Sequence, residues 1–313
     1  MTTLQAQRAD LRQNHLLAAL LAALPAADWQ RWVDVMEAVD LPLGRVLCAP
    51  GAMPSHIYFP ATAVVSLLYL TRDGASSEVA VIGNDGLVGY SLLMGGNATP
   101  SQAVVQSEGQ GFRIPAQFIK AEMECAGPAL VVMLRYTQAL IGQVAQTAAC
   151  NRHHGIEQQL SRRLLMALDR GAPKSEVRMT QELASSLLGV RREGITAAAL
   201  KLQNAGIISY RRGRIDVLDR ARLEQRSCEC YAVAKQEYDR LLPQACFADA
   251  AVNATAAAPS ASPVPVCASY RPTYPRSYAN ANANASTSTK TVLGAASALP
   301  ARPRSMHLAD AWR

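Results

Sequence analysis

The sequence contains little cysteine and no long apolar segment. Seven cysteines in 313 residues are too few for a small secreted fold held by disulfides, and an odd number leaves one cysteine unpaired. A membrane-spanning helix needs about 20 consecutive apolar residues, whereas the longest apolar runs here are Leu16 to Leu24 and Ala129 to Leu134. We therefore predict a cytoplasmic chain that contacts no membrane.

Motifs of common enzyme classes are absent as well. The sequence has no glycine-rich phosphate loop before a helix, no His-Glu-x-x-His and no Gly-x-Ser-x-Gly. Its five histidines supply little acid–base chemistry. We predict that the chain is not an enzyme. A thiol enzyme that uses Cys150 as nucleophile and His153 as base is the catalytic alternative.

Basic residues are concentrated in the middle of the chain. The net charge is +7, but residues 1–149 contain 8 Lys and Arg against 11 Asp and Glu, whereas residues 150–226 contain 15 against 8. Such an asymmetry indicates that the basic part contacts a polyanion.

Short apolar runs separated by turn residues fill the segment from Leu41 to Phe118. This spacing predicts an antiparallel β-roll. Two short helices, Leu16 to Leu24 and Trp29 to Val39, precede it, and we assign residues 15–127 to one domain. The expected strands are residues 45–48, 57–59, 63–70, 78–82, 102–106 and 111–114.

From Pro128 onward the apolar residues follow a helical period. We predict a helix over residues 128–151 whose apolar stripe alternates steps of four and three residues: Leu130, Leu134, Thr137, Ile141, Val144 and Ala148. Such a stripe allows a helix to pair with its counterpart across a two-fold axis, so it predicts a homodimer. The alternative is an ordinary helix that packs on its own domain.

Residues 179–218 contain the most specific pattern in the chain. Thr180 is a suitable N-cap for a helix that ends at Leu188, and Gly189 provides a tight turn before a second helix that runs from Arg192 to Gly206. Two short helices joined in this way form a helix-turn-helix, whose second helix can enter the major groove of DNA. The expected buried faces are Leu183, Ala184, Leu187 and Leu188 in the first helix, and Ile195, Ala198, Ala199 and Leu202 in the second.

A basic hairpin follows the second helix. Residues 207–210 and 214–218 alternate around the turn Arg211-Arg212-Gly213, which predicts the wing of a winged helix-turn-helix. We place this winged domain in residues 152–226. A C-terminal helix is predicted for residues 227–246, and a disordered tail for residues 247–313, which are rich in Ala, Ser, Thr, Pro and Asn. The predicted fold class is therefore α+β.

The exposed residues of the winged domain have predicted roles in DNA binding. Arg192 has the geometry to pair with guanine, and Glu193 to accept a hydrogen bond from cytosine, so these two are predicted to read bases. Double-stranded DNA is the expected partner. The alternatives are a packing or dimerisation module, or a ligand or redox sensor that acts through a protein partner. Predicted phosphate contacts are Thr180, Arg191, Thr196, Lys201, Arg211, Arg212 and Arg214.

The order of β-roll, long helix and winged helix-turn-helix resembles the Crp-Fnr family of bacterial transcription regulators, over residues 15–245. Gly189-Val190-Arg191-Arg192-Glu193 is similar to the family's Gly-x-Ser-Arg-Glu turn into the recognition helix. The resemblance implies that this arginine and glutamate read bases, that the β-roll is a sensor domain and that RNA polymerase is a further partner. Ala197 replaces a second family arginine, which implies a different or less constrained DNA site.

The sensor part departs from the family pattern for cyclic nucleotides. Members that bind cyclic nucleotide carry a glutamate for the ribose and an arginine for the phosphate, and here Tyr90 and Ser101 occupy those positions. We therefore expect weak or no binding of cyclic AMP, and the sequence names no other effector. The degenerate effector pocket is assigned to Gly86, Gly89, Tyr90, Ser101 and Gln102.

The cysteines predict neither a metal site nor a cofactor. Family members with an iron–sulfur cluster place several cysteines near the N-terminus, whereas the first cysteine here is Cys48. Cys228-x-Cys230 is closer than the two to four residues usual between zinc-binding cysteines, and zinc sites supply two more ligands nearby, so we predict plain packing or exposed thiols for this pair. Positions on the surface of a hinge are predicted for Cys150, His153 and His154.

Overall fold

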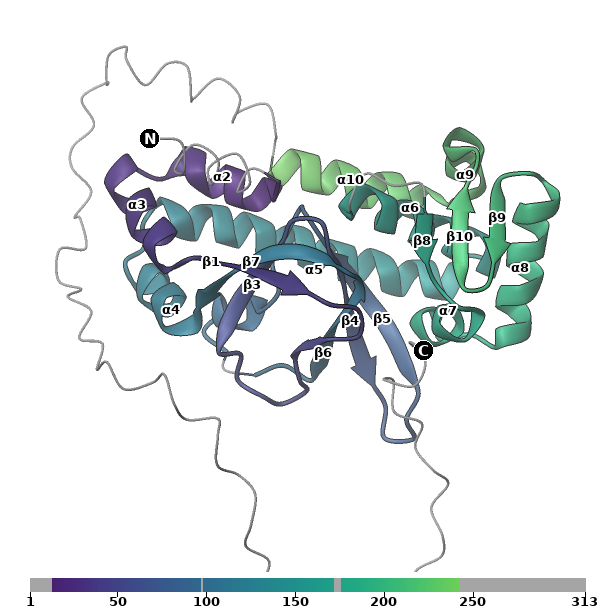
Figure 1. The fold of residues 1–313 in the computed structure, drawn as a ribbon, viewed down its shortest axis with the longest axis horizontal. Helices are drawn as coiled ribbons and strands as arrows, with labels where there is room; N and C mark the ends of the chain where they lie inside the picture. Colours follow the sequence, from purple (N-terminus) through teal and green to yellow (C-terminus); the bar gives the residue numbers. More distant parts are fainter. Residues whose placement is uncertain (1–12, 97, 172–175, 243–313) are drawn as a thin grey trace, which may run out of the picture.

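The computed structural model of the chain describes residues 13–96, 98–171 and 176–242 (Figure 1). The predicted tail, residues 247–313, lies outside the described residues, as do residues 243–246 of the predicted C-terminal helix. The predicted α+β fold is confirmed, because a β-roll, a long helix and a winged helix-turn-helix follow one another.

The helices and strands are α2 (His15–Ala23), α3 (Ala26–Val35), β1 (Glu37–Leu41), β2 (Val46–Cys48), β3 (His56–Pro60), β4 (Val64–Leu70), β5 (Ser76–Ile82), the 3-10 helix η1 (Tyr90–Leu92), β6 (Ser101–Ser107), β7 (Gly109–Pro115), α4 (Ala116–Glu124), α5 (Pro128–His153), α6 (Ile156–Arg170), β8 (Glu176–Arg178), α7 (Gln181–Leu188), α8 (Arg192–Asn204), β9 (Ile208–Arg211), β10 (Arg214–Val217), α9 (Arg220–Arg226) and α10 (Glu229–Leu241).

The β-roll consists of two antiparallel sheets with the strand orders β1-β7-β3 and β2-β6-β4-β5. The inner side chains of both sheets share one core, to which Val65 and Leu67 of β4 belong. Val64 and Leu68 of the same strand belong to a second core, formed with the helices of the winged domain. Because successive side chains of a strand point to opposite faces, β4 is covered on both sides, which explains its continuous apolar run.

The N-terminal segment differs from the sequence prediction at one point. The helix predicted to reach Val39 ends at Val35, and residues Glu37–Leu41 form strand β1, which pairs with β7. The alternation of Val39 and Leu41 with Asp40 is the local strand signal. A short segment whose sequence fits both a helix and a strand forms the structure for which the fold offers a partner. Here the edge of β7 is available for pairing, so the segment forms a strand.

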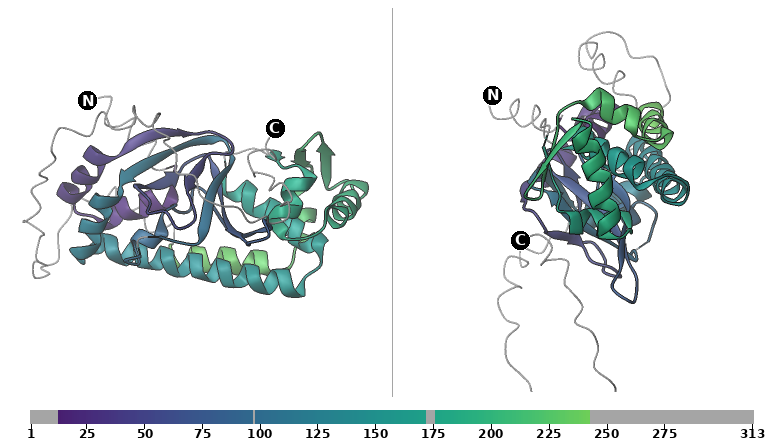
Figure 2. Two further views of the ribbon diagram at one scale, coloured as in Figure 1. Left: turned by 90° about the horizontal axis from the view of Figure 1, so that it is seen from below. Right: turned by 90° about the vertical axis from the view of Figure 1, so that its right-hand side faces the viewer.

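The long helix α5 runs along one side of the molecule and leads from the β-roll to the winged domain (Figure 2). Helix α10 packs against it, with the Tyr238 hydroxyl donating to Gln143 Oε1 at 3.3 Å. One face of α5, which includes Met133 and Tyr136, is completely buried.

Among the described residues, no single helix is long and apolar enough to cross a bilayer. Only the pair α4 and α5, which is bent by 108°, satisfies the requirements of length and composition together.

Another face of α5 exposes apolar side chains. Val131, Leu134 and Ile141 are 50%, 51% and 56% exposed. Exposed residues continue from them at steps of three and four, and we call the resulting stripe the α5 seam: Val131, Leu134, Gln138, Ile141, Ala145 and Ala148. This spacing is that of a helix that pairs with another helix.

The α5 seam shares only half of the residues in the predicted stripe. Leu134, Ile141 and Ala148 belong to both, whereas Leu130 and Val144 are half-buried. The prediction is wrong for Thr137, which is buried and donates its hydroxyl hydrogen to the carbonyl oxygen of Met133 at 2.9 Å. The β-roll and α10 cover that side of α5. The exposed stripe therefore contains residues 131, 138 and 145 in place of the predicted residues 130, 137 and 144.

The winged domain packs directly on the β-roll through α6. The second core combines Val64 and Val104 of the four-stranded sheet with Leu160 and Leu164 of α6. It continues into α7, α8 and the wing, so the outer face of the sheet and the winged domain share one apolar interior. A displacement of α6 from the sheet therefore requires separation of apolar surfaces that are buried together.

A buried polar network lies inside this contact. The Arg163 guanidinium of α6 forms an ion pair with the Glu78 carboxylate of β5, and their side chains are only 5% and 6% exposed. Arg163 also donates to Gln106 Oε1 of β6, and Ser66 Oγ of β4 donates to Glu78. Three strands of the sheet thus hold one charged side chain of the winged domain.

Candidate nucleic-acid interface

Helices α7 and α8 form the predicted helix-turn-helix. The Thr180 hydroxyl accepts the backbone N–H of Leu183 at 3.0 Å and so caps α7. Gly189 follows α7 with φ of 66° and ψ of 33°, a left-handed conformation that glycine adopts without strain. The buried residues of both helices are those that the sequence predicts, so local caps, turn and periodicity are sufficient to position α8.

The outer face of α8 carries the predicted base-reading residues. Arg192 and Glu193 are exposed in the first turn of the helix, and Arg191 is its N-cap residue. Among the residues that the structure describes, no side chain caps this N-terminus, so N–H groups at the start of α8 remain available for an anionic acceptor. Further exposed residues of α8 include Thr196, Ala197, Leu200, Lys201 and Gln203.

The wing is held firmly beside α8. Strands β8, β10 and β9 form its antiparallel sheet in that order. The Tyr210 hydroxyl donates to the carbonyl oxygen of Met179 at 2.9 Å, and its backbone N–H donates to Gln203 Oε1 of α8 at 3.0 Å. Burial raises the pKa of Tyr210 to about 12, so its hydroxyl remains a neutral donor at physiological pH.

The tip of the wing has an unusual residue in a strained conformation. Arg212 has φ of 47° and Gly213 has φ of 77°, as a two-residue hairpin turn of this type requires. Glycine and asparagine favour the first of these positions, whereas the left-handed conformation costs other residues about 1–2 kcal/mol. Its side chain thus stands at the tip of the wing at the cost of backbone strain.

Most basic side chains of the interface lack an acidic partner, unlike several arginines elsewhere in the domain. Within the described residues, five of them have no carboxylate at ion-pair distance: Arg191, Arg192, Lys201, Arg211 and Arg212. Arg163, Arg170 and Arg220, away from this face, each have an acidic partner. The positive charge of these five side chains is therefore not compensated by the part of the chain that the structure describes.

Two predicted phosphate contacts are engaged in other interactions. Arg214 Nη1 lies 3.7 Å from Glu176 Oε1, so part of its charge is compensated. The Thr196 hydroxyl lies 3.0 Å from both Gln181 Oε1 and the carbonyl oxygen of Arg192, so its single hydrogen is used inside the chain and only its lone pairs remain for another donor.

A groove between α8 and the wing brings most of these residues together. Sequence reasoning missed Gln181 and Gln203, whose amides lie in this groove, and gave no role to Leu200, which is 54% exposed. The helical period that starts at Arg192 could have identified Leu200 and Gln203, because residues 192, 196, 199, 200 and 203 lie on one face of α8. The groove is lined by Thr180, Gln181, Arg192, Thr196, Ala199, Leu200, Gln203, Tyr210, Arg212 and Gly213.

In the β-roll, the two substituted nucleotide positions lie close together. The Tyr90 hydroxyl is 3.1 Å from Thr99 Oγ1 and 3.5 Å from Ser101 Oγ, and the latter two are 2.9 Å apart. These hydroxyls satisfy one another, and the sequence contains no Lys or Arg between Arg72 and Arg113. A buried cyclic phosphate needs a cationic partner, and none of these residues supplies one.

The remaining predicted pocket residues have local structural explanations. A Cβ at Gly86 would lie 2.6 Å from the Tyr136 ring, and Gly89 has φ of 104°, which favours glycine. Gln102 is half-buried, and its Oε1 atom is buried without a hydrogen-bond partner in the described part of the chain.

The cysteine and histidine candidates are rearranged relative to the sequence prediction. Cys150 is completely buried rather than on the surface, because α10 covers the end of α5, and it lies beside Cys228, Cys230 and His154. Cys150 Sγ and Cys228 Sγ share a hydrogen bond at 3.5 Å, and this contact lowers the pKa of Cys228. His153 is exposed, and no hydrogen bond in the described ranges joins it to Cys150, which gives the thiol-enzyme alternative no support.

Comparison with known proteins identifies both domains. Residues 38–124 match the family model of the cyclic nucleotide-binding domain, and residues 158–226 match that of the Crp-like helix-turn-helix domain. A chain with these two domains in this order is a transcription regulator with a DNA-binding helix-turn-helix domain. It belongs to the Crp-Fnr family.

Solved structures show the same fold. FixK2 from Bradyrhizobium japonicum is 15% identical with a TM-score of 0.54, and the match covers 62% of this chain and 98% of that one. A CRP-family transcriptional regulator from Thermus thermophilus is 19% identical with a TM-score of 0.51, covering 60% and 96%. A crp/fnr-family protein from Eubacterium rectale is 17% identical with a TM-score of 0.53, covering 64% and 94%. No curated protein sequence matches the chain.

Proposed function

We propose that the chain is a homodimeric transcription regulator that binds near-palindromic DNA through α8 and the wing, and whose effector is not cyclic AMP. Its partners are double-stranded DNA, a second copy of the chain and RNA polymerase. The observation that carries the proposal is the exposed first turn of α8, where Arg192 has no carboxylate partner in the described residues and lies beside a basic wing.

Base reading is assigned to the first turn of α8. Arg192 presents two donors to guanine O6 and N7, and Glu193 accepts from cytosine N4, each contact providing about 1–3 kcal/mol of discrimination. The unpaired Arg191, Lys201, Arg211 and Arg212 supply phosphate contacts, which position the protein and make binding salt-dependent. Leu200 offers an apolar contact on the same face, of the kind that a thymine methyl group accepts.

Two-fold symmetry follows from the α5 seam. Its exposed apolar residues favour a second copy as the occupant, because the same stripe on both chains is self-complementary across a two-fold axis. The two α8 helices then meet successive major grooves, which requires half-sites about 34–36 Å apart.

Selection of binding sites from random duplex DNA tests the proposal. At physiological salt we expect the full-length protein to enrich a two-fold-symmetric motif, and Arg192→Ala to relax one base pair in each half-site at a cost of about 1–3 kcal/mol. Arg222→Ala is the matched control, because Arg222 is an exposed arginine of α9 that does not line the groove. Failure to enrich a motif, also after addition of cell extract, would favour a sensor that acts through a protein partner.

Substitution of the wing tip separates stability from DNA binding. In Arg212→Asn we expect the folded state to gain about 1 kcal/mol, because asparagine tolerates a positive φ. DNA affinity should fall at the same time, and its salt dependence should decrease by about one counterion per chain. Thermal unfolding and salt-dependent fluorescence anisotropy measure the two effects.

Arg211→Asn is the control for this experiment. Arg211 lies at the end of β9 and has no positive φ, so its substitution should weaken DNA binding without a gain in stability. An equal change of stability in both variants would contradict the strain at Arg212.

The substituted nucleotide pocket gives a further expected result. Isothermal titration of the full-length protein with cyclic AMP should show no binding in the micromolar range, because Tyr90 and Ser101 stand in place of the charged anchors. Addition of the nucleotide should also leave the melting temperature unchanged. A micromolar dissociation constant would contradict this part of the proposal.

A further inference from the structure

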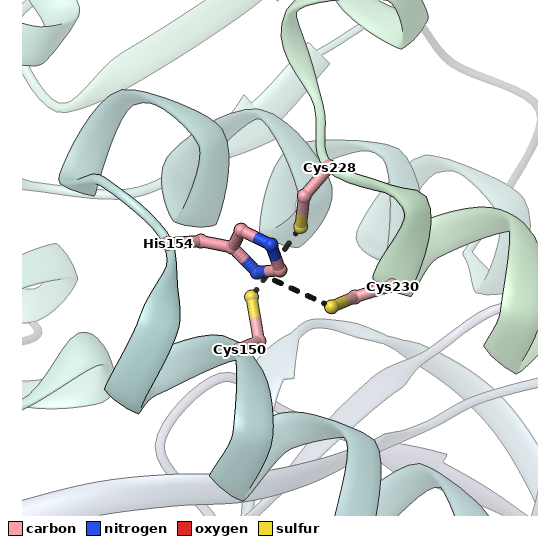
Figure 3. Close-up of side chains that lie close together, drawn as sticks. All are labelled: Cys150, His154, Cys228 and Cys230. Carbon is pink, nitrogen blue, oxygen red and sulfur yellow. Dashed lines mark hydrogen bonds between the residues drawn. The ribbon is translucent and has the colours of Figure 1, made fainter.

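Four metal-ligating side chains meet where the long helix ends and the C-terminal helix begins (Figure 3). Cys150 lies in the last turn of α5 and His154 follows directly after this helix. Cys228 is the N-cap residue of α10, and Cys230 lies in its first turn. Each of two segments, far apart in sequence, thus contributes two ligands.

The cluster is buried and separate from the apolar cores. Cys150, Cys228 and Cys230 are 0%, 5% and 1% exposed and form a small core of their own, distinct from the two large ones. His154 is half-buried at its rim. Thiol packing would place cysteines among aliphatic side chains as small hydrophobes, whereas here they face one another and an imidazole.

The spacing of the four ligand atoms suits a single tetrahedral ion. All four lie within 4.8 Å of one another. Cys150 Sγ is 3.5 Å from Cys228 Sγ, and Cys230 Sγ is 3.4 Å from His154 Nδ1. Bonds of about 2.3 Å to sulfur and about 2.0 Å to nitrogen place the ligands of tetrahedral zinc about 3.5–3.8 Å apart, which is close to these two separations.

We propose that Cys150, His154, Cys228 and Cys230 bind one zinc ion in a structural site. Protein ligands occupy all four positions, which is typical of structural rather than catalytic zinc. Three thiolates and one imidazole also favour zinc over harder divalent cations such as magnesium or calcium. A multinuclear iron–sulfur cluster fits less well, because ligands of different iron atoms are further apart than those of one ion.

The surroundings of the cluster supply the second set of contacts that metal ligands need. His154 Nε2 lies 3.2 Å from Glu229 Oε1, so the carboxylate accepts the ring N–H and Nδ1 is left facing the cysteines. A carboxylate in this position fixes the tautomer of a ligating histidine. Gln146 Nε2 donates to Cys230 Sγ at 3.0 Å, a hydrogen bond that stabilises a thiolate.

The charge of the surroundings also matches. Three thiolates and a divalent cation carry one net negative charge. Arg162 of α6 is 6% exposed, acts electrostatically on Cys150 and has no carboxylate partner within the described residues. A buried guanidinium without a counter-charge is costly, and the anionic zinc site provides that counter-charge.

Zinc at this place ties the start of α10 to the end of α5. The tie lies next to Gly155, where α5 ends and α6 of the winged domain begins. The site therefore fixes the direction in which the winged domain leaves the long helix. This inference is independent of the proposed DNA contacts, because none of the four ligands lines the groove.

The metal content of the full-length protein tests the proposal. Purified without chelator and analysed by plasma mass spectrometry, the wild type should contain about one zinc per chain. Cys150→Ser and Cys228→Ser should each lose most of it. Cys48→Ser should retain it, because Cys48 is a buried cysteine outside the cluster and so a matched control.

A second variant keeps the test valid if the serine variants do not fold. Glu229→Gln leaves all four ligands in place and changes an exposed side chain. We expect it to weaken zinc binding about 10–100-fold in competition with a chromophoric chelator. Replacement of zinc by Co²⁺ should give thiolate-to-cobalt charge transfer and the intense visible bands of a tetrahedral site.

Several results would overturn the assignment. They are a zinc-free wild type, zinc retained by the variant that combines Cys150→Ser with Cys228→Ser, a Cys150–Cys228 disulfide found after thiol blocking, or iron with the visible absorption of an iron–sulfur cluster.

Discussion

Glu78→Ala is expected to destabilise the protein by about 3–5 kcal/mol. The substitution removes the carboxylate that pairs with Arg163 and leaves a guanidinium that is 5% exposed without a counter-charge. Neither Gln106 nor Ser66, the other polar groups of this network, carries a charge. The loss is measured as the shift of the denaturant midpoint at constant slope in full-length protein.

Two control variants separate the burial of this charge from the loss of an ion pair in general. The double variant Glu78→Ala with Arg163→Met should recover most of the loss, because no uncompensated charge remains. Glu37→Ala removes the exposed partner of Arg113 and should cost less than about 1 kcal/mol. A loss below about 1 kcal/mol for Glu78→Ala would show that the guanidinium finds water or another acceptor.

The same pair also connects the two halves of the regulator. Glu78 belongs to the four-stranded sheet of the β-roll and Arg163 to the first helix of the winged domain, and apolar residues of these two parts form one core. Any state in which the winged domain leaves the sheet has to separate this pair. This contact therefore stabilises the observed position of the winged domain against the β-roll. Any other position would have to form a contact that compensates for its loss.

The helix-turn-helix was predictable because its signals are local. The N-cap at Thr180, the left-handed Gly189 and the apolar period of the two helices lie within a short segment, and each requires the same structure. The wing was predictable for the same reason, since alternation and turn residues are adjacent in sequence. Neither depends on a distant part of the chain.

The features that sequence reasoning missed depend on distant contacts. Strand β1 forms because β7 offers it an edge, and the side on which α5 is exposed depends on where the β-roll and α10 cover it. The cluster of Cys150 and His154 with Cys228 and Cys230 exists only because α10 returns to the end of α5. Residue spacing along the chain contains none of these distances.

Ile141→Glu is expected to convert the protein to a monomer and to lower its affinity for a two-fold-symmetric DNA site by about 10²–10⁴-fold. Ile141 is 56% exposed and lies near the middle of the α5 seam. In a dimer the seam meets its own counterpart, so the variant places carboxylates into an apolar contact where they lose water without gaining a partner. In a monomer, binding of one half-site no longer raises the effective concentration of a second winged domain at the other half-site.

Ile141 is exposed, so misfolding of the single chain would not explain a loss of dimerisation in this variant. Because the side chain contributes little to the interior of its own chain, circular dichroism and monomer stability should remain unchanged. Ile141→Leu preserves the apolar contact and should remain dimeric, as measured by light scattering after size exclusion. A dimer that persists in Ile141→Glu would show that another surface joins the two chains. A monomeric wild type that binds a single half-site would instead support the alternative that α5 packs only on its own domain.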